Sequence, residues 1–387
     1  MLEKITLRVE KWVNDGFTLG FYDNSPVFVL GAIPGETVVC DLFEVTSKYS
    51  KGSVNKVIDP SPLRREAPCD IYLECGGCTF QHIDYTEEKI IKENLLKNDI
   101  IFNKLVDIND SILNSIPFHS EEEYAYRNNV QVKNKNGMNG FYKVKSNQLV
   151  PFPESGCLLL DKELNQYIKN FPSKIPLDGK IRKDSKGIKK YGSEISVFQI
   201  KDVTYEIPEN GFFQINQFLV EAWLEKIKSL SGVENQILEL FCGAGVISCF
   251  LSQNQTQIHG IELSHQSIQY AKQNAKKNSL SNLTFEKKDL YRDDIYFNPK
   301  TDFLCIANPP RAGLGKIVKK YIKNIKPKKI IYSSCNYTTL IPDLKDLIGL
   351  YKIQSIEIFD FFPKTPYFET LVVLDKKNLA NSILPSN

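Results

Sequence analysis

Residues 236–262 constrain the fold of this 387-residue chain more than any other segment. An apolar run over 236–241 ends at the turn Cys242-Gly243-Ala244-Gly245, helix-forming residues follow to 252, and a second apolar run covers 258–262. A strand, a glycine-rich turn and a helix in this order let a ligand approach bare backbone at the start of the helix. The segment therefore predicts one unit of a parallel α/β sheet, with a ligand site at the glycine turn.

The alternation of helix and strand continues toward the C-terminus. We expect a helix over 218–230, an apolar helical stripe made by Ile268, Ala271 and Ala275, and strands near 303–307, 329–333 and 370–374. Such a βαβ series forms a mostly parallel, doubly wound sheet. The sequence therefore predicts an α/β fold, with this Rossmann-like sheet as a domain over residues 216–387.

The first 215 residues show different patterns. Over 1–59, apolar residues such as Ile5, Leu7 and Val9 alternate with polar ones, and turn residues such as Asp15-Gly16 separate the runs. A small all-β, OB-like barrel fits this segment, and such barrels often bind RNA. The following residues mix one helix near 86–97 with strands near 126–133, 139–144 and 203–207. We predict a barrel domain over 1–60 and an α+β central domain over 61–215.

The composition is that of a soluble globular protein, with 42% hydrophobic and 25% charged residues. No apolar run approaches the roughly 20 residues that span a bilayer, and the N-terminus carries charges where a signal peptide is apolar. We expect a cytoplasmic protein with no membrane partner, and a monomer. In that compartment the nine cysteines stay reduced and act as metal ligands, nucleophiles or core residues.

Two basic runs are compatible with an RNA partner, although the net charge of +3 is too small to indicate one by itself. Residues 316–329 contain seven lysines and no acidic residue, and residues 179–192 contain six Lys or Arg and one Asp. Each run could follow phosphates or form a solvated lysine-rich face, and the sequence leaves both alternatives open.

Two carboxylates stand where a nucleoside could be bound. Glu262 ends the strand after the glycine turn, so it could accept hydrogen bonds from both hydroxyls of a ribose. Asp289 ends the next expected strand and is placed to reach an adenine amino group. The turn lacks the three-glycine spacing of dinucleotide-binding proteins, which argues against NAD. The turn and the two carboxylates together resemble the first motifs of S-adenosylmethionine-dependent methyltransferases.

Three further segments place reactive side chains at strand ends of the same sheet. Asn308-Pro309-Pro310-Arg311 follows one expected strand, Cys335 follows another, and Glu369 precedes a third. A thiolate that adds to C6 of uracil makes C5 reactive toward a methyl group, and a carboxylate must then remove the C5 proton. Because a free thiol has a pKa of about 8.5, the thiolate needs a nearby cation such as Arg311. The alternative for Cys335 is a small buried core residue.

Over nearly its whole length the chain resembles the RNA uracil-5-methyltransferase family, in particular its bacterial members that act on 23S ribosomal RNA. Phe212-Phe213-Gln214-Ile215-Asn216 is similar to the family motif whose Gln contacts the target base. Ser334-Cys335-Asn336 is similar to its nucleophile motif, and Phe368-Glu369-Thr370 to the motif that supplies its proton-abstracting Glu. Residues 1–59, including 28–36, resemble the TRAM domain, an RNA-binding barrel of some members. The resemblance implies S-adenosylmethionine as cofactor, RNA as partner and C5 of a uridine as the methylated atom.

The expected site residues fall into three groups. The catalytic residues are Cys335 and Glu369, the contacts with the cofactor come from Gln214, Phe241, Gly243, Glu262, Asp289 and Asn308, and those with the base come from Gln214, Asn308 and Arg311. The family usually has Asp where this chain has Asn308, and often His where it has Tyr367. The first departure leaves the choice of base open, and the second leaves the orientation of Glu369 open.

Four cysteines form a separate expected site in the central domain. Cys69, Cys75 and Cys78 lie close together in the sequence, the last two in a Cys-Gly-Gly-Cys turn, and Cys157 is distant. Four thiolates suit zinc or a 4Fe-4S cluster, and spacing does not choose between them. Phe80-Gln81-His82 and residues 151–156 resemble the iron–sulfur segment of the ribosomal-RNA members, and this resemblance implies a 4Fe-4S cluster.

Two other functions are compatible with parts of the sequence. Asn308-Pro309-Pro310 resembles the motif of methyltransferases that act on amino groups of adenine or cytosine, but Arg311 replaces their aromatic residue and they need no thiol. A non-catalytic RNA-binding assembly factor would need neither Cys335 nor Glu369. Within the resembled family, transfer RNA is the alternative substrate.

Overall fold

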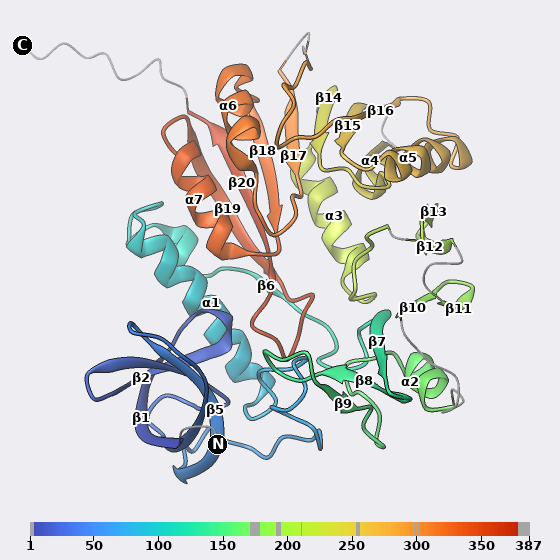
Figure 1. Cartoon of the computed structure of the whole chain (residues 1–387). Helices are drawn as coiled ribbons and strands as arrows, with labels where there is room; N and C mark the ends of the chain where they lie inside the picture. Colours follow the sequence, from blue (N-terminus) through green and yellow to red (C-terminus); the bar gives the residue numbers. More distant parts are fainter. Residues whose placement is uncertain are drawn as a thin grey trace, which may run out of the picture. The chain divides into compact units, whose positions relative to one another are not determined.

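A computed structural model describes residues 4–170, 179–190, 195–209, 211–252, 256–297, 299 and 302–377 (Figure 1). Internal contacts divide the chain into two compact units. Unit 1 comprises Met1–Leu96, Glu122–Arg182 and Phe362–Tyr367, and unit 2 comprises Lys97–Glu121, Lys183–Phe361 and Phe368–Asn387. The chain therefore passes repeatedly from one unit to the other, and the three domains expected from the sequence stay a prediction.

Unit 1 begins with a closed five-stranded barrel in the order β1-β2-β3-β5-β4. Its elements are β1 (Lys4–Trp12), η1 (Asn14–Gly16), β2 (Phe17–Tyr22), β3 (Ser25–Leu30), β4 (Thr37–Val45) and β5 (Ser50–Asp59). Every second residue of β1 points inward, so Ile5, Leu7 and Val9 are buried against apolar residues of the other strands. The barrel predicted for the N-terminus is confirmed.

The rest of unit 1 combines helical segments with small antiparallel strands. These elements are the first part of α1 (Tyr85–Phe102), β7 (Asn129–Lys135), β8 (Met138–Tyr142), β9 (Leu149–Pro151), α2 (Lys162–Lys169) and the start of β10 (Gly179–Asp184), which pairs with β7. Asp161 caps α2, because its side chain accepts a hydrogen bond from the Glu163 N–H at 2.9 Å. This mixture matches the α+β character expected for the middle of the chain.

The separate segment Phe362–Tyr367 is packed into unit 1 through Lys364. The fully buried Nζ of Lys364 lies 3.6 Å from Glu88 Oε2 and 2.7 Å from Glu123 Oε2. Its backbone oxygen accepts hydrogen bonds from the N–H groups of Thr79 and Phe80, at 2.7 and 3.2 Å. Because a buried ammonium without a partner is costly, these ion pairs are what allow the segment to be buried there.

Unit 2 is built on an eight-stranded sheet in the order β16-β15-β14-β17-β18-β20-β19-β6. Its strands are β6 (Phe118–His119), β14 (Gln236–Leu240), β15 (Gln257–Glu262), β16 (Leu283–Lys287), β17 (Leu304–Ala307), β18 (Lys329–Ser334), β19 (Tyr351–Phe359) and β20 (Glu369–Lys376). The strands from β16 to β18 are parallel, and β20 lies antiparallel between β18 and β19. Nearly every residue of β14, β17 and β18 is buried, as is typical of a sheet covered on both faces.

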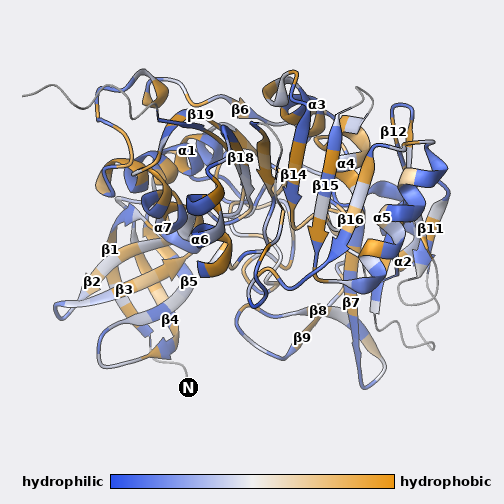
Figure 2. Ribbon diagram, turned by 90° about the horizontal axis from the view of Figure 1, so that it is seen from above, coloured by the Kyte–Doolittle hydropathy of each residue, from blue (hydrophilic) through white to orange (hydrophobic). Residues whose placement is uncertain are grey.

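Helices cover both faces of this sheet (Figure 1). On one face α3 (Val220–Ser231), α4 (Val246–Leu251) and α5 (His265–Lys277) contact one another in series, and on the other α6 (Gly315–Ile325) contacts α7 (Tyr337–Leu347). Figure 2 shows hydrophobic residues along the strands and hydrophilic residues along α5. The predicted α/β, doubly wound fold is confirmed. Within the described ranges, no helix combines the length and hydrophobicity that a bilayer span requires.

A hairpin of unit 2, formed by β12 (Ser196–Ile200) and β13 (Val203–Ile207), lies beside α5; the remaining elements are η2 (Ser111–Leu113) and β11 (Gly187–Lys190). The fully buried Asn274 of α5 joins the hairpin to the glycine turn. Its Oδ1 accepts from the Glu206 N–H at 2.8 Å, and its Nδ2 donates to Ala244 O at 3.0 Å. A single side chain thus couples the position of the hairpin to that of the glycine turn, where the sequence predicts a ligand site.

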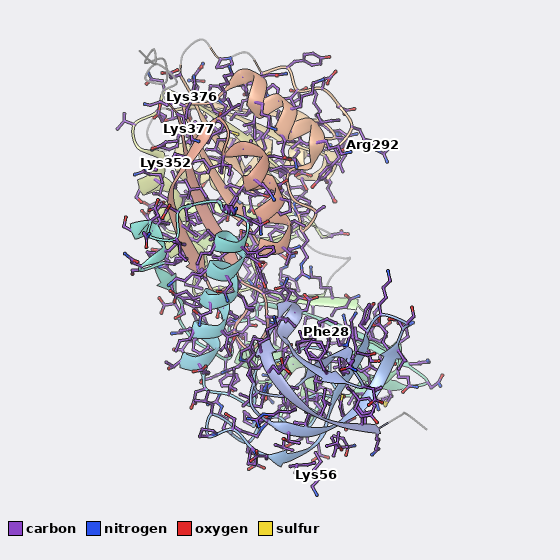
Figure 3. All side chains as sticks on the ribbon, turned by 90° about the vertical axis from the view of Figure 1, so that its left-hand side faces the viewer. Phe28, Lys56, Arg292, Lys352, Lys376 and Lys377 are labelled. Carbon is purple, nitrogen blue, oxygen red and sulfur yellow. The ribbon has the colours of Figure 1, made fainter. Side chains whose placement is uncertain are left out.

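Exposed lysines gather at the end of the sheet opposite to the start of β20. Lys352 lies near the start of β19, Lys376 ends β20, and Lys377 follows it (Figure 3).

The basic run 316–329 forms most of α6, the turn after it and the first residue of β18. Within α6, Lys319 forms an ion pair with Asp343 at 3.0 Å. Residues 191 and 192 of the other basic run lie outside the described residues.

Candidate active site

The candidate nucleophile and the candidate base lie at the same end of two neighbouring strands. Strand β18 ends at Ser334, and in the antiparallel register Ser334 is opposite Thr370. Cys335 therefore leaves the sheet beside Glu369, which begins β20. Since β14 and β17 run parallel to β18, the glycine turn and Asn308 follow strand ends at this same edge.

The Cys335 thiol interacts with an acidic and with a basic side chain. Burial, with a smaller contribution from the charge of Glu369, raises its pKa to about 11, against the opposing effects of the charge of Arg311 and a hydrogen bond from its guanidinium. The loop that carries Arg311 is fixed to the start of α7, because Arg311 O accepts from Asn336 Nδ2 at 3.2 Å and from Thr339 Oγ1 at 3.0 Å. The expected proximity of Arg311 to Cys335 is thus present, although the thiol is protonated at neutral pH in this state.

Glu369 is a buried carboxyl group, only 2% exposed. Burial raises its pKa from 4.5 to about 7, against the opposing effect of a hydrogen bond from Ser333. That bond joins Ser333 Oγ to Glu369 Oε1 at 2.5 Å. A carboxyl group with a pKa near neutrality can both take and release a proton, as general acid–base chemistry requires. Tyr367, whose position raised the question of how Glu369 is oriented, belongs to unit 1.

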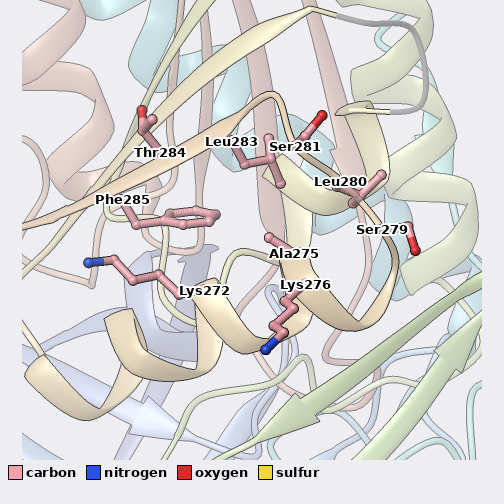
Figure 4. A pocket seen from close by; sticks show the side chains of 9 residues that line it. All are labelled: Lys272, Ala275, Lys276, Ser279, Leu280, Ser281, Leu283, Thr284 and Phe285. Atoms are coloured by element: carbon pink, nitrogen blue, oxygen red, sulfur yellow. The ribbon is translucent and has the colours of Figure 1, made fainter.

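The glycine turn after β14 holds backbone groups in unusual conformations. Phe241 has φ 63° although it is not glycine, and Gly243 and Gly245 have φ 55° and 76°. A Cβ added to Gly243 would meet no atom within 4 Å, so open space lies above it. A Cβ added to Gly245 would instead lie 3.1 Å from the ring of Phe285. Figure 4 shows Phe285 on β16 extending toward Ala275 of α5, where both line an open pocket.

Glu262 at the end of β15 closes the turn. Its Oε2 accepts from the Gly243 N–H at 3.2 Å and its Oε1 from the Ser264 N–H at 2.8 Å. Because backbone N–H groups donate to both of its oxygens, the Glu262 carboxylate is held in a fixed position beside the open space at Gly243. Glu239 of β14 lies behind the turn, where burial raises its pKa to about 8 and the Ser248 hydroxyl donates to it.

Three other expected ligand residues lie around this edge of the sheet. Asp289 Oδ1 accepts from the Tyr291 N–H at 2.9 Å, and the ring of Tyr291 lies 5.7 Å from that of Phe241. Asn308 is partly buried, and its N–H donates to Leu240 O at 3.4 Å. Gln214 is 7% exposed and lies in the loop between β13 and α3.

Sequence reasoning missed Ser333 and Trp223. Trp223 of α3 donates from Nε1 to Ser333 Oγ at 3.1 Å, and Ser333 in turn contacts Glu369. In the sequence Ser333 looks like any small residue at the end of a strand, and Trp223 like an apolar helix position. Only the packing of α3 on β18 brings them together, so no local signal could have identified them.

The four cysteines of the second expected site lie together in unit 1. One cavity of about 250 Å³ is lined by all four cysteines, Cys69, Cys75, Cys78 and Cys157, together with Arg127. Burial raises the pKa of each of the four thiols. In the part of the chain that the structure describes, no three His, Cys, Asp or Glu side chains converge closely enough to hold a metal ion as they stand.

Comparison with known proteins settles the family. A sequence model of the tRNA (uracil-5-)-methyltransferase family matches residues 162–291 and 292–377, which is more than half of the chain. The chain belongs to the uracil-5-methyltransferase family. A Leptospira interrogans relative, described as an uncharacterized RNA methyltransferase, is 33% identical over 97% of this chain and 95% of its own length. A protein of the same description from Aquifex aeolicus is 28% identical over 97% and 99% of the two chains.

A solved structure shares the fold of the whole chain. The crystal structure of Pyrococcus abyssi tRNA (uracil-54, C5)-methyltransferase in complex with S-adenosyl-L-homocysteine aligns with a TM-score of 0.73 and 22% identity. The alignment covers 95% of this chain and 99% of that one. The family model and the Leptospira interrogans relative confirm the family membership expected from the sequence, and the protein is an RNA methyltransferase of the uracil-5 family.

Proposed function

We propose that this methyltransferase transfers a methyl group from S-adenosylmethionine to C5 of a uridine in 23S ribosomal RNA, with Cys335 as nucleophile and Glu369 as base. The observation that carries the proposal is that Cys335 leaves β18 beside the buried Glu369 and that its thiol interacts with both Glu369 and Arg311. Family membership supplies the reaction class, and this trio of side chains supplies the groups that the reaction needs.

The glycine turn fits S-adenosylmethionine. Open space above Gly243 leaves room for a ligand against bare backbone, and a carboxylate is held at its side by two backbone N–H groups. Glu262 would accept hydrogen bonds from the ribose, while Phe241 and Asp289 would lie along the nucleoside. When bound there, the cofactor supplies an activated methyl group. Gln214 and Asn308, at the same edge of the sheet, would contact both the cofactor and the base.

The reaction uses two side chains in sequence. After the Cys335 thiol has lost its proton to solvent, the thiolate adds to C6 of the uracil ring. The electron pair of the C5–C6 double bond then becomes available at C5 to take the methyl group, while the electrons of the broken sulfur–methyl bond would stay with the cofactor. Glu369 then accepts the C5 proton, the electrons of that C–H bond restore the double bond, and the C6–S bond breaks to release the thiolate. Glu369 returns to its starting state when it loses the proton to solvent.

Arg311 has a defined part in this scheme. Because burial and Glu369 both favour the neutral thiol, the guanidinium, helped by a backbone hydrogen bond, favours the thiolate. RNA binding would also displace water and place the electron-poor ring beside the sulfur. We propose that Asn308 accepts from uracil N3–H through its amide oxygen and donates to O4, so that it can serve where the family usually has Asp.

The four cysteines of unit 1 are proposed to hold a 4Fe-4S cluster. In favour of the cluster are the four thiols around one cavity and the resemblance of the surrounding segments to the iron–sulfur members of the family. Bound there, it would tie residues 69–78 to residue 157 and so stabilise unit 1. We assign it no step in the reaction. We also propose that the N-terminal barrel is a TRAM domain that contacts RNA.

Covalent trapping tests both the chemistry and the RNA. Purified enzyme is mixed with the cofactor and with 23S ribosomal RNA or transfer RNA from the same organism, transcribed with 5-fluorouridine. Fluorine at C5 cannot leave as a proton, so we expect a stable protein–RNA adduct with the ribosomal RNA that is absent in Cys335→Ala. An adduct formed only with transfer RNA would move the substrate to the alternative that the P. abyssi protein represents. The absence of any adduct while methylation proceeds would exclude the thiol mechanism.

A further inference from the structure

Two buried side chains that take no part in the proposed chemistry are linked to Glu369 by hydrogen bonds, Ser333 directly and Trp223 through Ser333. Ser333 Oγ donates to Glu369 Oε1 at 2.5 Å, and Trp223 Nε1 donates to Ser333 Oγ at 3.1 Å. The three residues are 2%, 0% and 2% exposed in the order Glu369, Ser333, Trp223. All three belong to unit 2. A buried row of hydrogen bonds that ends on the candidate base calls for an explanation.

Strand geometry directs Ser333 to the helix that carries Trp223. Successive residues of a strand point to opposite faces of a sheet. Tyr332 of β18 points toward α7, where its hydroxyl donates to Asp343 at 2.9 Å. Ser333 therefore points to the other face, where α3 packs on β18. Since β20 is the antiparallel neighbour of β18, the Ser333 hydroxyl can reach Glu369 at the start of that strand.

The order of donors in this row fixes the direction of every proton. An indole N–H can only donate, so Ser333 Oγ must accept from Trp223. A hydroxyl has a single proton, and the one on Ser333 must then point to Glu369. Glu369 Oε1 accepts this bond whether the carboxyl group is ionised or has been protonated on its other oxygen. The row thus occupies Oε1 in both states and leaves Oε2 for the transferred proton.

We propose that Ser333, held by Trp223, is a positioning residue that fixes the Glu369 carboxylate so that Oε2 takes the C5 proton of the methylated uracil. The inference rests on the proposed function, in which Glu369 is that base. It answers how Glu369 is oriented in a chain that has Tyr367 where relatives often have His. The hydroxyl acts through Glu369 alone and contacts neither the thiol nor the cofactor in the proposed scheme.

Replacing Ser333 with Thr or Val provides a matched pair of variants. The two side chains have the same shape, but only Thr keeps the hydroxyl. Each variant, and the parent, is loaded with the cofactor and natural RNA in a single turnover, and formation and decay of the methylated covalent adduct are followed on denaturing gels. A hydrogen bond to a charged group is worth about a ten- to hundredfold change in rate when lost. We expect Ser333→Val to slow adduct decay by that factor and Ser333→Thr to stay within a few-fold of the parent.

Three further readouts separate positioning from a general structural role. Affinity for S-adenosylmethionine and the rate of adduct formation should be unchanged in Ser333→Val, because the base acts after methyl transfer. The pH at which adduct decay reaches half its maximal rate should rise, because the Ser333 bond favours the ionised carboxylate. Trp223→Phe removes the N–H together with one ring of the indole, and should slow decay several-fold by freeing the hydroxyl to rotate.

Several results would overturn the inference. Adduct decay in Ser333→Val at the parent rate and with the parent pH profile would show that Glu369 needs no such partner. Equal losses in the Thr and Val variants, with matching drops in melting temperature, would assign Ser333 to packing alone. A parent enzyme that forms no adduct would remove the proposed function itself. That outcome is recognised before any Ser333 variant is compared.

Discussion

Ionisation of Glu369 should be visible in the free enzyme without any RNA. The pKa of this carboxyl group is raised from 4.5 to about 7 by burial. About a tenth of the molecules would then carry the ionised group at pH 6 and about nine-tenths at pH 8, whereas an ordinary Glu is almost fully ionised at both. Trp223 is one of two tryptophans in the chain and is linked to Glu369 through Ser333. Replacing Trp12 with Phe makes it the sole tryptophan, whose emission can be excited apart from that of the tyrosines.

We expect the fluorescence of Trp223 in this Trp12→Phe protein to titrate with a midpoint near pH 7. The same raised pKa makes the free energy of unfolding depend on pH. Because the folded-state value is above the ordinary one, the contribution of Glu369 to stability is complete below pH 4.5 and is lost as the pH rises through 7. At about 1.4 kcal/mol per pKa unit, the ionised carboxylate costs the fold about 3 kcal/mol above pH 7.

Glu369→Gln in the same Trp12→Phe background is the control. This variant should show no fluorescence titration. Its free energy of unfolding, measured in urea, should increase relative to that of the parent between pH 4.5 and 7, and the difference should then stay constant. A midpoint near 4.5, or the same titration in the Gln variant, would show that burial does not perturb Glu369. The role of Glu369 as a base poised near neutrality would then lose its physical basis.

Three other measurements test the site and the cysteines. Cys335→Ala should abolish methylation and adduct formation with cofactor affinity near the parent's, and turnover above about a thousandth of the parent rate would contradict the covalent mechanism. Glu369→Gln should still add and methylate but accumulate a methylated adduct on denaturing gels, and free turnover without that adduct would point to another base. Anaerobically purified parent should be brown and contain iron, while Cys75→Ser should lose iron, thermal stability and RNA affinity together; colourless parent with stoichiometric zinc would refute the iron–sulfur cluster.

The strands and the first helices of unit 2 could be predicted because their signals are local. The helix expected over 218–230 is α3, and the strands expected near 258–262, 329–333 and 370–374 are β15, β18 and β20. Each is a continuous apolar run bounded by turns, as buried parallel strands require. The convergence of Cys335, Arg311 and Glu369 followed from strand order, since ligands of such folds gather at the carboxyl ends of the strands.

Features that depend on packing were not predictable. Helix α6 appeared in the sequence as a lysine run, although Val318 and Ile322 form its buried stripe. Helix α7 contains Pro342, which argues against a helix, yet its apolar residues pack on the sheet. The row from Trp223 to Glu369 spans 110 and then 36 residues of sequence, so it exists only once the sheet is assembled.

The segment around Lys364 has a consequence for how the chain is made. The ribosome releases the barrel and most of unit 1 early, yet Phe362–Tyr367 belongs to unit 1 and comes after almost all of unit 2. Until that segment emerges, Thr79 and Phe80 lack the backbone acceptor that Lys364 provides. Completion of the first unit must therefore await synthesis of nearly the whole protein. For the same reason, a fragment of the methyltransferase sheet alone would carry a lysine whose acidic partners were left behind, and interrupted synthesis would leave neither unit finished.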